Sequence, residues 1–313
     1  MNKNDFDYLL KVLKENAGWD FSEEEYFILD KKITNFVREK GYAAVEELID
    51  EVRLGQKSFI SQLVESLTLL GTSFYRDYSV FRQFEDNILP YLREYNRGVK
   101  KLRVWSAGCS TGQETYSIAI SIKNKLLNVS DWDIDIIGTD ISEQAIVKAK
   151  NGSYNQFEIQ MGMNARKIID NFHYEKDSWL ANDDIAAMVS FKKNNLLDDF
   201  SLSKKFDVIF CRYVLSMFTK EYQKKIIRNM FNVQTSNGLF YVGKKEKIEG
   251  IEEFYSKVPG FDGLYQARSV DKVQKLNAPD KETADAAKKP EMPSFVRPEK
   301  LIKRPTISSL LRK

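Results

Sequence analysis

The chain has 313 residues, of which 42% are hydrophobic and 30% are charged, and its formal net charge is +3. This length is enough for one sizeable core and a smaller domain, and so slight a charge does not by itself indicate nucleic-acid binding. The single histidine, His173, lies in a polar stretch, so catalysis by a Ser/His or Cys/His pair and a histidine-ligated metal are not expected.

The two cysteines, Cys109 and Cys211, both lie in apolar contexts that indicate strands and turns, and no secretory segment opens the chain. We therefore expect no disulfide scaffold and a reducing, cytoplasmic setting. No apolar run reaches the ~18 to 20 residues that a membrane span requires.

Residues 1–71 are predicted to form a small, all-helical N-terminal domain. Apolar residues recur on one helical face near the start of the chain, and Ser22-Glu-Glu-Glu25 fits a capping box for the next helix. Two more amphipathic helices are expected around residues 45–49 and 59–67. The basic side chains of the second helix either face a partner or are simply solvated; they are Lys31, Lys32, Arg38 and Lys40.

Residues 72–272 are predicted to form an α/β domain. After a helix expected from Val80 to Tyr91, with Pro90 marking its end, short apolar runs alternate with helical patterns, which favours a doubly wound parallel sheet. The expected strands lie near 102–105, 134–141, 188–191, 206–211, 238–242 and 263–265. Residues 153–187 lack clear periodicity and are interpreted as a small inserted subdomain.

Within this domain the strand beginning near Leu102 runs into a turn of small residues, Gly108, Ser110 and Gly112, and then into a helix. A strand, a glycine-rich turn and a helix present backbone N–H groups to a nucleotide-like ligand. Asp140 ends the second strand, roughly 20 to 30 residues beyond the glycines, where an acid is placed to accept both ribose hydroxyls. The alternative is that Asp140 is a plain surface acid.

Residues 273–313 are predicted to be a disordered tail, because prolines and charged residues are dense in them and apolar residues are few. The last segment, 301–313, interleaves apolar pairs with basic residues. It is interpreted either as a docking peptide for a partner or as a frayed end.

Five motifs occur in the order and spacing of one known family. They are Gly71-Thr-Ser-Phe-Tyr-Arg76, Trp105-Ser-Ala-Gly-Cys-Ser-Thr-Gly112, Thr139-Asp140, Asn195-Leu-Leu197 and Phe206-Asp-Val-Ile-Phe-Cys-Arg212. Over roughly residues 5–270 the chain resembles the CheR chemotaxis methyltransferases. These enzymes move a methyl group from S-adenosylmethionine to glutamate side chains of chemoreceptors.

The resemblance implies a Rossmann-like, S-adenosylmethionine-dependent methyltransferase sheet preceded by the small helical domain. It implies that the cofactor is bound by Thr72, Arg76, Gly108, Glu114, Asp140, Asn195, Leu196, Arg212 and Tyr213, and that no metal is needed. Arg76 is also the expected catalytic residue, because its guanidinium can hold the incoming carboxylate by paired hydrogen bonds. Alternative roles are a helix cap for Thr72 and a surface ion pair for Arg76. The implied partners are the cytoplasmic helices of methyl-accepting chemoreceptors.

The chain also departs from the family pattern. Leu70 replaces an asparagine, Tyr213 an asparagine near the cofactor, Met217 a tyrosine near the transfer site, and Lys244 a histidine. Three hypotheses follow: an active glutamate methyltransferase, a catalytically impaired relative that binds S-adenosylmethionine or S-adenosylhomocysteine and acts through protein contacts, and a methyltransferase for small molecules or nucleic acid. The third lacks the Asn/Asp-Pro-Pro-aromatic signature of amino-group methylation, and the first is favoured. No glycine-rich loop follows Gly162 in the insert, so recognition of a receptor's C-terminal peptide there is not expected.

Overall fold

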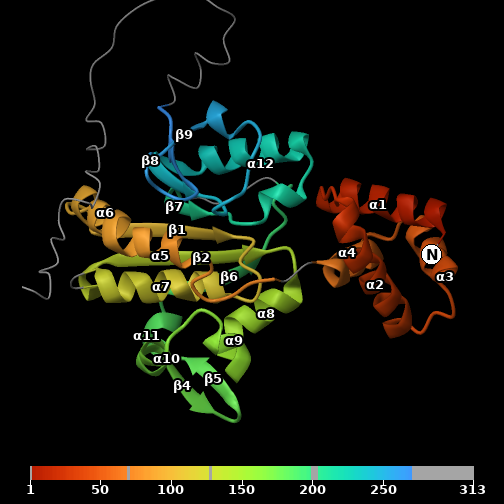
Figure 1. Cartoon of the computed structure of the whole chain (residues 1–313), viewed down its shortest axis with the longest axis horizontal. Helices are drawn as coiled ribbons and strands as arrows, with labels where there is room; N and C mark the ends of the chain where they lie inside the picture. The colour runs from red at the N-terminus through yellow and green to blue at the C-terminus, as the bar shows by residue number, and fades with distance from the viewer. Residues whose placement is uncertain (1, 69–70, 127–128, 199–203, 270–313) are drawn as a thin grey trace, which may run out of the picture.

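The computed structural model describes residues 2–68, 71–126, 129–198 and 204–269 (Figure 1). Leu70 and the expected tail at 273–313 lie outside the described residues. Within the described residues, no helix is both long enough and apolar enough to cross a membrane.

The N-terminal part of the chain, residues 2–68, contains the helices α1 Lys3–Ala17, α2 Glu23–Glu39, α3 Val45–Arg53 and α4 Lys57–Leu67. The predicted capping box is confirmed, since the Glu25 carboxylate accepts a hydrogen bond from the Ser22 backbone N–H at 2.8 Å. Helix α1 ends at Gly18, whose φ of 73° is the left-handed conformation that glycine adopts without a steric penalty. The four helices lie to one side of the sheet (Figure 1). Their buried leucines belong to one hydrophobic cluster that continues into one face of the sheet.

The predicted α/β class is confirmed by a seven-stranded sheet in the order β6-β2-β1-β7-β8-β10-β9. Its strands are β1 Lys101–Ala107, β2 Asp133–Asp140, β6 Val189–Lys193, β7 Phe206–Phe210, β8 Gln234–Tyr241, β9 Tyr255–Lys257 and β10 Leu264–Ala267. The first five strands in this order are parallel, whereas β10 and β9 pair in antiparallel fashion. The sheet is thus mostly parallel with an antiparallel edge, and β9, which has only three residues, was not among the expected strands.

Helices cover both faces of the sheet, as expected for a doubly wound fold. On one face, Trp105 of β1 and Ile209 of β7 pack with α12 Lys220–Asn232. On the other face, the neighbouring residues Val104 and Val208 pack with α7 Gln113–Lys125 (Figure 1). Successive strand residues point to opposite faces, so near-continuous apolar runs are what a sheet buried on both sides requires. Helix α8, Glu143–Asn151, follows β2.

The expected helix end at Pro90 is wrong. The chain runs from α5 Tyr78–Gln83 through a π-helical turn, Phe84–Ile88, into α6 Leu89–Tyr95. In the π turn the backbone N–H of Leu89 bonds to the carbonyl of Phe84, five residues earlier. Pro90 falls in the first turn of α6, where its missing N–H costs little, so the helical path continues past it.

The insert at 153–187 contains a three-stranded antiparallel sheet in the order β3-β5-β4, with three short helices around it. The elements are β3 Ser153–Tyr154, α9 Gln156–Gln160, α10 Ala165–Asn171, β4 Phe172–Glu175, β5 Ser178–Ala181 and α11 Asp183–Ala186. Each is too short to show a hydrophobic period. The β4–β5 turn uses positive φ at Lys176 and Asp177 rather than glycine, so it carries no sequence signal.

Candidate functional site

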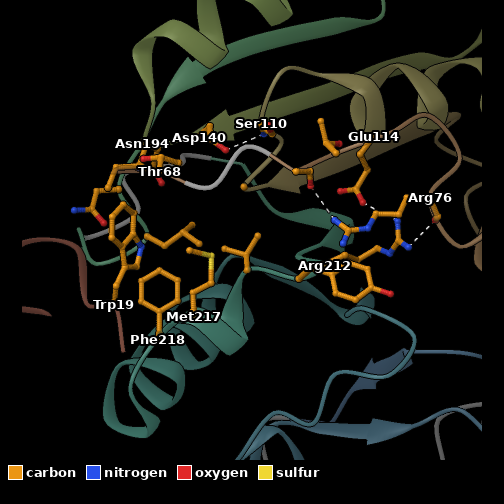
Figure 2. Close-up of a pocket in the computed structure, with 18 of the residues that line it drawn as sticks. Trp19, Thr68, Arg76, Ser110, Glu114, Asp140, Asn194, Arg212, Met217 and Phe218 are labelled. Carbon is orange, nitrogen blue, oxygen red and sulfur yellow. Dashed lines mark hydrogen bonds and ion pairs between the residues drawn. The ribbon is translucent and has the colours of Figure 1, made fainter. Parts of the chain in front are cut away.

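A pocket lies at the carboxyl ends of β1, β2, β6 and β7, between the sheet and the four N-terminal helices (Figure 2). The pocket encloses about 840 Å³ of empty space when the part open to solvent is counted. Open α/β sheets bind ligands at this edge. All residues nominated from the sequence line this one pocket: Thr72, Arg76, Gly108, Glu114, Asp140, Asn195, Leu196, Arg212 and Tyr213.

Asp140 holds the glycine-rich turn in place. One of its carboxylate oxygens accepts the Ser110 backbone N–H at 2.8 Å, and the other accepts the Ser142 N–H at 3.0 Å. The residue is only 7% exposed, so it is not a plain surface acid. Burial raises its pKa, against the opposing effect of these amide hydrogen bonds. A carboxylate has about four acceptor positions, more than these amide groups use, so Asp140 can also accept a hydroxyl from a ligand.

Gly108 is required by both its conformation and its surroundings. Its φ is 71°, and a Cβ atom placed there would lie 2.4 Å from Cγ2 of Val214. Val214 also lines the pocket, and the turn can lie this close to Val214 only if residue 108 has no side chain.

We expect Gly108→Ala to weaken ligand binding in this pocket and to destabilise the fold, because the left-handed backbone and the contact with Val214 are both strained. The strain at φ alone costs on the order of 1 kcal/mol or more. Thermal unfolding and calorimetric titration would measure the two effects. Gly98→Ala, at a position with open space around it and no positive φ, is the matched control, and an equal response from both variants would contradict this account.

Arg212 ties the loop before α5 to the first turn of α7. Its side chain is 1% exposed and forms ion pairs with Glu114 at 2.9 Å and with Asp77 at 2.7 Å. It also donates to the backbone carbonyl of Arg76 at 2.7 Å. Ser106 donates a hydrogen bond to the same Glu114 at 2.9 Å. Removing one partner of a buried ion pair leaves an uncompensated charge and strongly destabilises the protein. The Arg212 guanidinium therefore holds both carboxylates in fixed positions.

Tyr213, which stands where the family has asparagine, adopts a left-handed φ of 61°. Its backbone N–H donates to Glu246 at 2.6 Å, and its hydroxyl donates to Asp77. Burial opposes ionisation of Asp77, but the hydrogen bond from Tyr213 and the charge of Arg212 outweigh it and lower the pKa of Asp77. Asp77 therefore stays ionised and holds both side chains. Its importance was not anticipated from the sequence, although it directly follows a quoted motif.

Arg76 stacks its guanidinium on the ring of Tyr213, 3.9 Å from the ring centroid. Its Nη1 donates to the backbone carbonyl of Gly71 at 3.0 Å. No ion pair between Arg76 and a carboxylate occurs among the residues the structure describes, so the alternative of a surface ion pair is not seen. Thr72 likewise caps no helix, because α5 begins at Tyr78 with Asp77 as its N-cap residue.

The opposite end of the pocket is apolar and carries residues that sequence reasoning missed. Trp19 and Phe218 lie there with Met217, well apart from Arg76 (Figure 2). The backbones of Trp19 and Phe218 form an isolated antiparallel bridge, and the Asp20 N–H donates to the carbonyl of Met217 at 2.8 Å. The structure thus places Met217 in this apolar wall.

Two polar residues complete this end, Thr68 and Asn194. The side-chain oxygen of Asn194 is buried, and within the described ranges it has no hydrogen-bond partner. Buried acceptors are normally paired, so this oxygen is available to a donor on a ligand. The neighbouring Asn195 instead uses its side chain within the protein, donating to the carbonyl of Asn16 at 3.3 Å and accepting from the Leu197 N–H at 3.0 Å.

Lys244 does not line the pocket. Its ammonium pairs with Asp262 at 2.9 Å and lies 3.1 Å from the Ser79 hydroxyl. The ammonium lowers the pKa of Asp262, which keeps this pair charged near neutral pH.

The two cysteines are both buried and free.

Comparisons with known proteins agree with this geometry. Residues 71–262 match the family described as CheR methyltransferase, SAM binding domain. Chemotaxis protein methyltransferase Cher2 of Pseudomonas putida is 27% identical over 270 residues, which cover 84% of this chain and 98% of the relative. A chemotaxis protein methyltransferase of Borreliella burgdorferi is 29% identical over 256 residues, covering 80% and 90%.

Among solved structures, the plantazolicin methyltransferase BpumL in complex with SAH aligns with 54% of this chain and 49% of its own at 16% identity. The TM-score of 0.30 is too low for this alignment to support a functional conclusion.

The residues present fit S-adenosylmethionine. The Asp140 carboxylate can accept a ribose hydroxyl, and the unpaired oxygen of Asn194 can accept the adenine amino group. Trp19 and Phe218 provide an apolar wall suited to the adenine ring. With the family match over residues 71–262, the chain therefore belongs to the CheR methyltransferase family, and its cofactor is S-adenosylmethionine.

Proposed function

We propose that the protein transfers the methyl group of S-adenosylmethionine to glutamate side chains on the cytoplasmic helices of chemoreceptors, and that it acts in the cytoplasm. The names of its relatives, which are chemotaxis protein methyltransferases, support the pathway. The positive charge of Arg76 in the pocket supports a carboxylate as the acceptor.

The observation that carries the proposal is the state of Arg76. This cation lines the pocket, lies over the Tyr213 ring and has no carboxylate partner among the described residues. The neighbouring Arg212, by contrast, is ion-paired with both Glu114 and Asp77. An arginine held in one orientation and lacking a counter-ion is suited to binding an incoming carboxylate through two parallel hydrogen bonds.

Methyl transfer to a carboxylate asks little acid–base chemistry of the protein. A glutamate is already ionised near neutral pH, so no general base has to remove a proton. The remaining task is to place the carboxylate oxygen in line with the methyl donor and to exclude water. S-adenosylmethionine supplies the electrophilic methyl group when it is bound. Arg76 would orient the acceptor, and the Tyr213 ring and the Asp77–Arg212 pair would keep Arg76 in place.

We assign the cofactor to the pocket in the following way. Asp140 binds the ribose, Asn195 and Leu196 lie beside the adenine, and Gly108 lets the backbone approach the cofactor. Glu114, Arg212 and Tyr213 shape the methionine end, and Thr72 and Arg76 lie between cofactor and acceptor. The large Tyr213 side chain, in place of asparagine, would restrict the acceptor to a slender group such as a single glutamate side chain.

The proposal is tested by incubating the protein with receptor-containing membranes and S-adenosylmethionine labelled with tritium in its methyl group, alongside calorimetric titration of the cofactor. Methyl esters hydrolyse in base, so the expected result is cofactor binding with receptor-bound label that alkali releases as volatile methanol. Binding without label would instead establish the impaired relative that acts through protein contacts. Alkali-stable label would contradict a carboxylate acceptor.

A further inference from the structure

The four N-terminal helices contribute to the cofactor pocket, although the matched cofactor-binding segment begins only at residue 71. Trp19, between α1 and α2, and Thr68, at the end of α4, both line it. The pocket therefore lies between two parts of the chain, and the contacts that hold these parts together also hold its two walls in place.

One of the contacts between the two parts is formed by backbone. Next to the Trp19–Phe218 bridge, the Thr219 N–H donates to the Gly18 carbonyl at 3.2 Å. A Cβ atom on Gly18 would lie 2.8 Å from the Phe218 ring, so the two segments are in close contact. This contact fixes the position of the segment between α1 and α2 relative to Phe218 and Thr219.

A further contact is made by one half-buried carboxylate. Glu65 of α4 is 14% exposed at its side chain and reaches across to the start of α8. Its Oε1 accepts the Ser142 hydroxyl at 2.7 Å and the Gln144 N–H at 2.8 Å, and its Oε2 lies 3.6 Å from the Lys193 ammonium. Beside it, α2 and α4 are separated from α8 by a groove that Glu39, Glu65 and Gln144 line, so this interface is not a continuous apolar core.

Glu65 is connected to the cofactor site through one residue. Ser142 donates its hydroxyl to Glu65 and its backbone N–H to Asp140 at 3.0 Å, and its hydroxyl oxygen accepts the Ala145 N–H as the cap of α8. Burial opposes ionisation of Glu65, but the hydrogen bonds from Gln144, Ser142 and Glu143 and the charge of Lys193 outweigh it and lower the pKa of Glu65. The carboxylate is thus charged whenever the protein is near neutral pH.

We propose that Glu65 is a latch: by binding Ser142 and Gln144 at the start of α8, it holds the N-terminal helices closed over the adenine end of the pocket and slows the release of cofactor. Glu65 does not line the pocket itself, so it is a positioning residue that acts through Ser142 and through the placement of Thr68 and Trp19. This inference concerns cofactor capture and holds whether or not the methyl acceptor is a glutamate.

The test compares Glu65→Ala, Glu65→Gln and the control Glu39→Gln, which removes a charge from an exposed position in the same groove. Release of S-adenosylhomocysteine is followed by stopped-flow tryptophan fluorescence, because Trp19 lies in the pocket wall. We expect release to be about tenfold faster in Glu65→Ala, faster by a smaller factor in Glu65→Gln, and unchanged in Glu39→Gln. Association should be no slower than in the wild type, since an open pocket admits the ligand freely.

A merely structural role would lower the unfolding temperature and leave the release rate of the folded protein unchanged, and that result would overturn the proposal. An equal acceleration in Glu39→Gln would also overturn it, because the effect would then reflect the charge of the groove. Glu65→Gln keeps an oxygen acceptor at the same reach and serves as the deciding variant if Glu65→Ala does not fold.

Discussion

Replacing Arg76 with alanine should nearly abolish methyl transfer and leave the affinity for S-adenosylmethionine within a few-fold of the wild type. The reason is the division of contacts in the pocket: Arg212 is ion-paired with Glu114 and Asp77, whereas Arg76 has no carboxylate partner among the described residues and is left to meet the acceptor. Loss of a placed donor in the transition state costs about 10²- to 10³-fold in kcat. Steady-state kinetics on receptor membranes and calorimetry of cofactor binding measure the two quantities separately.

Two further variants sharpen this test. Arg76→Lys keeps the positive charge but loses the planar pair of donors, so its kcat should lie between those of wild type and Arg76→Ala. Arg82→Ala removes an exposed arginine of α5 that pairs with Asp86, and it should behave like wild type. If Arg76→Ala lost cofactor affinity as severely as transfer, Arg76 would belong to the cofactor site instead.

Replacing Asp140 with alanine should raise the Kd for S-adenosylmethionine on the order of 10²-fold or more. Hydrogen bonds to a charged group are worth about 1.5–3 kcal/mol each, and two ribose hydroxyls are expected to use this carboxylate. Because Asp140 also accepts the Ser110 and Ser142 N–H groups, the variant should lose some stability and remain folded. Thermal unfolding and calorimetry measure these effects. Asp135→Asn, on the same strand outside the pocket, is the control, and unchanged affinity in Asp140→Ala would contradict the ribose assignment.

The pH dependence of cofactor affinity gives the same assignment a second test. Burial raises the pKa of Asp140 above its ordinary 3.8, and the form that accepts two hydroxyls is the carboxylate. As the pH falls through this raised pKa, protonation removes acceptor capacity and affinity should decrease, at a higher pH than an exposed aspartate would show. Asp140→Asn should have weak affinity with no such pH dependence; a pH response equal to that of the wild type would assign it to another group.

The site residues that could be predicted from the sequence are those marked by a pattern in the residues next to them. The turn at Gly108 and Gly112 follows a buried strand, and Asp140 ends the next one. The order of parallel strands brings these ends together at one edge, so a short stretch of sequence was enough to nominate them. Leu196 and Arg212 were added by family motifs, and they too line the pocket.

The remainder depends on contacts between distant parts of the chain. Trp19 reaches the pocket only because α1 and α2 dock beside Phe218, and nothing in the first helices marks it. Tyr75, Asp77, Ser110 and Tyr213 adopt positive φ without being glycine, so a search for glycine turns does not find them. Such strained residues are held by the surrounding hydrogen bonds and gather at functional sites.

Prediction of the fold from the sequence is limited in the same way. Long apolar runs revealed the central strands, whereas short elements such as β9 and the sheet of the insert contain too few residues to display a period. The π turn before Pro90 depends on a backbone hydrogen bond that residue propensities do not encode.

The central claim, that a carboxylate accepts the methyl group, is tested most directly by mass spectrometry of receptor peptides after incubation with the protein and S-adenosylmethionine. The account predicts peptides heavier by one methylene group, with fragment ions that place the addition on a glutamate side chain, removed by mild alkali and absent with Arg76→Ala. A methyl group on a lysine, an asparagine or a backbone nitrogen, or no methylation by a protein that binds the cofactor, would contradict it.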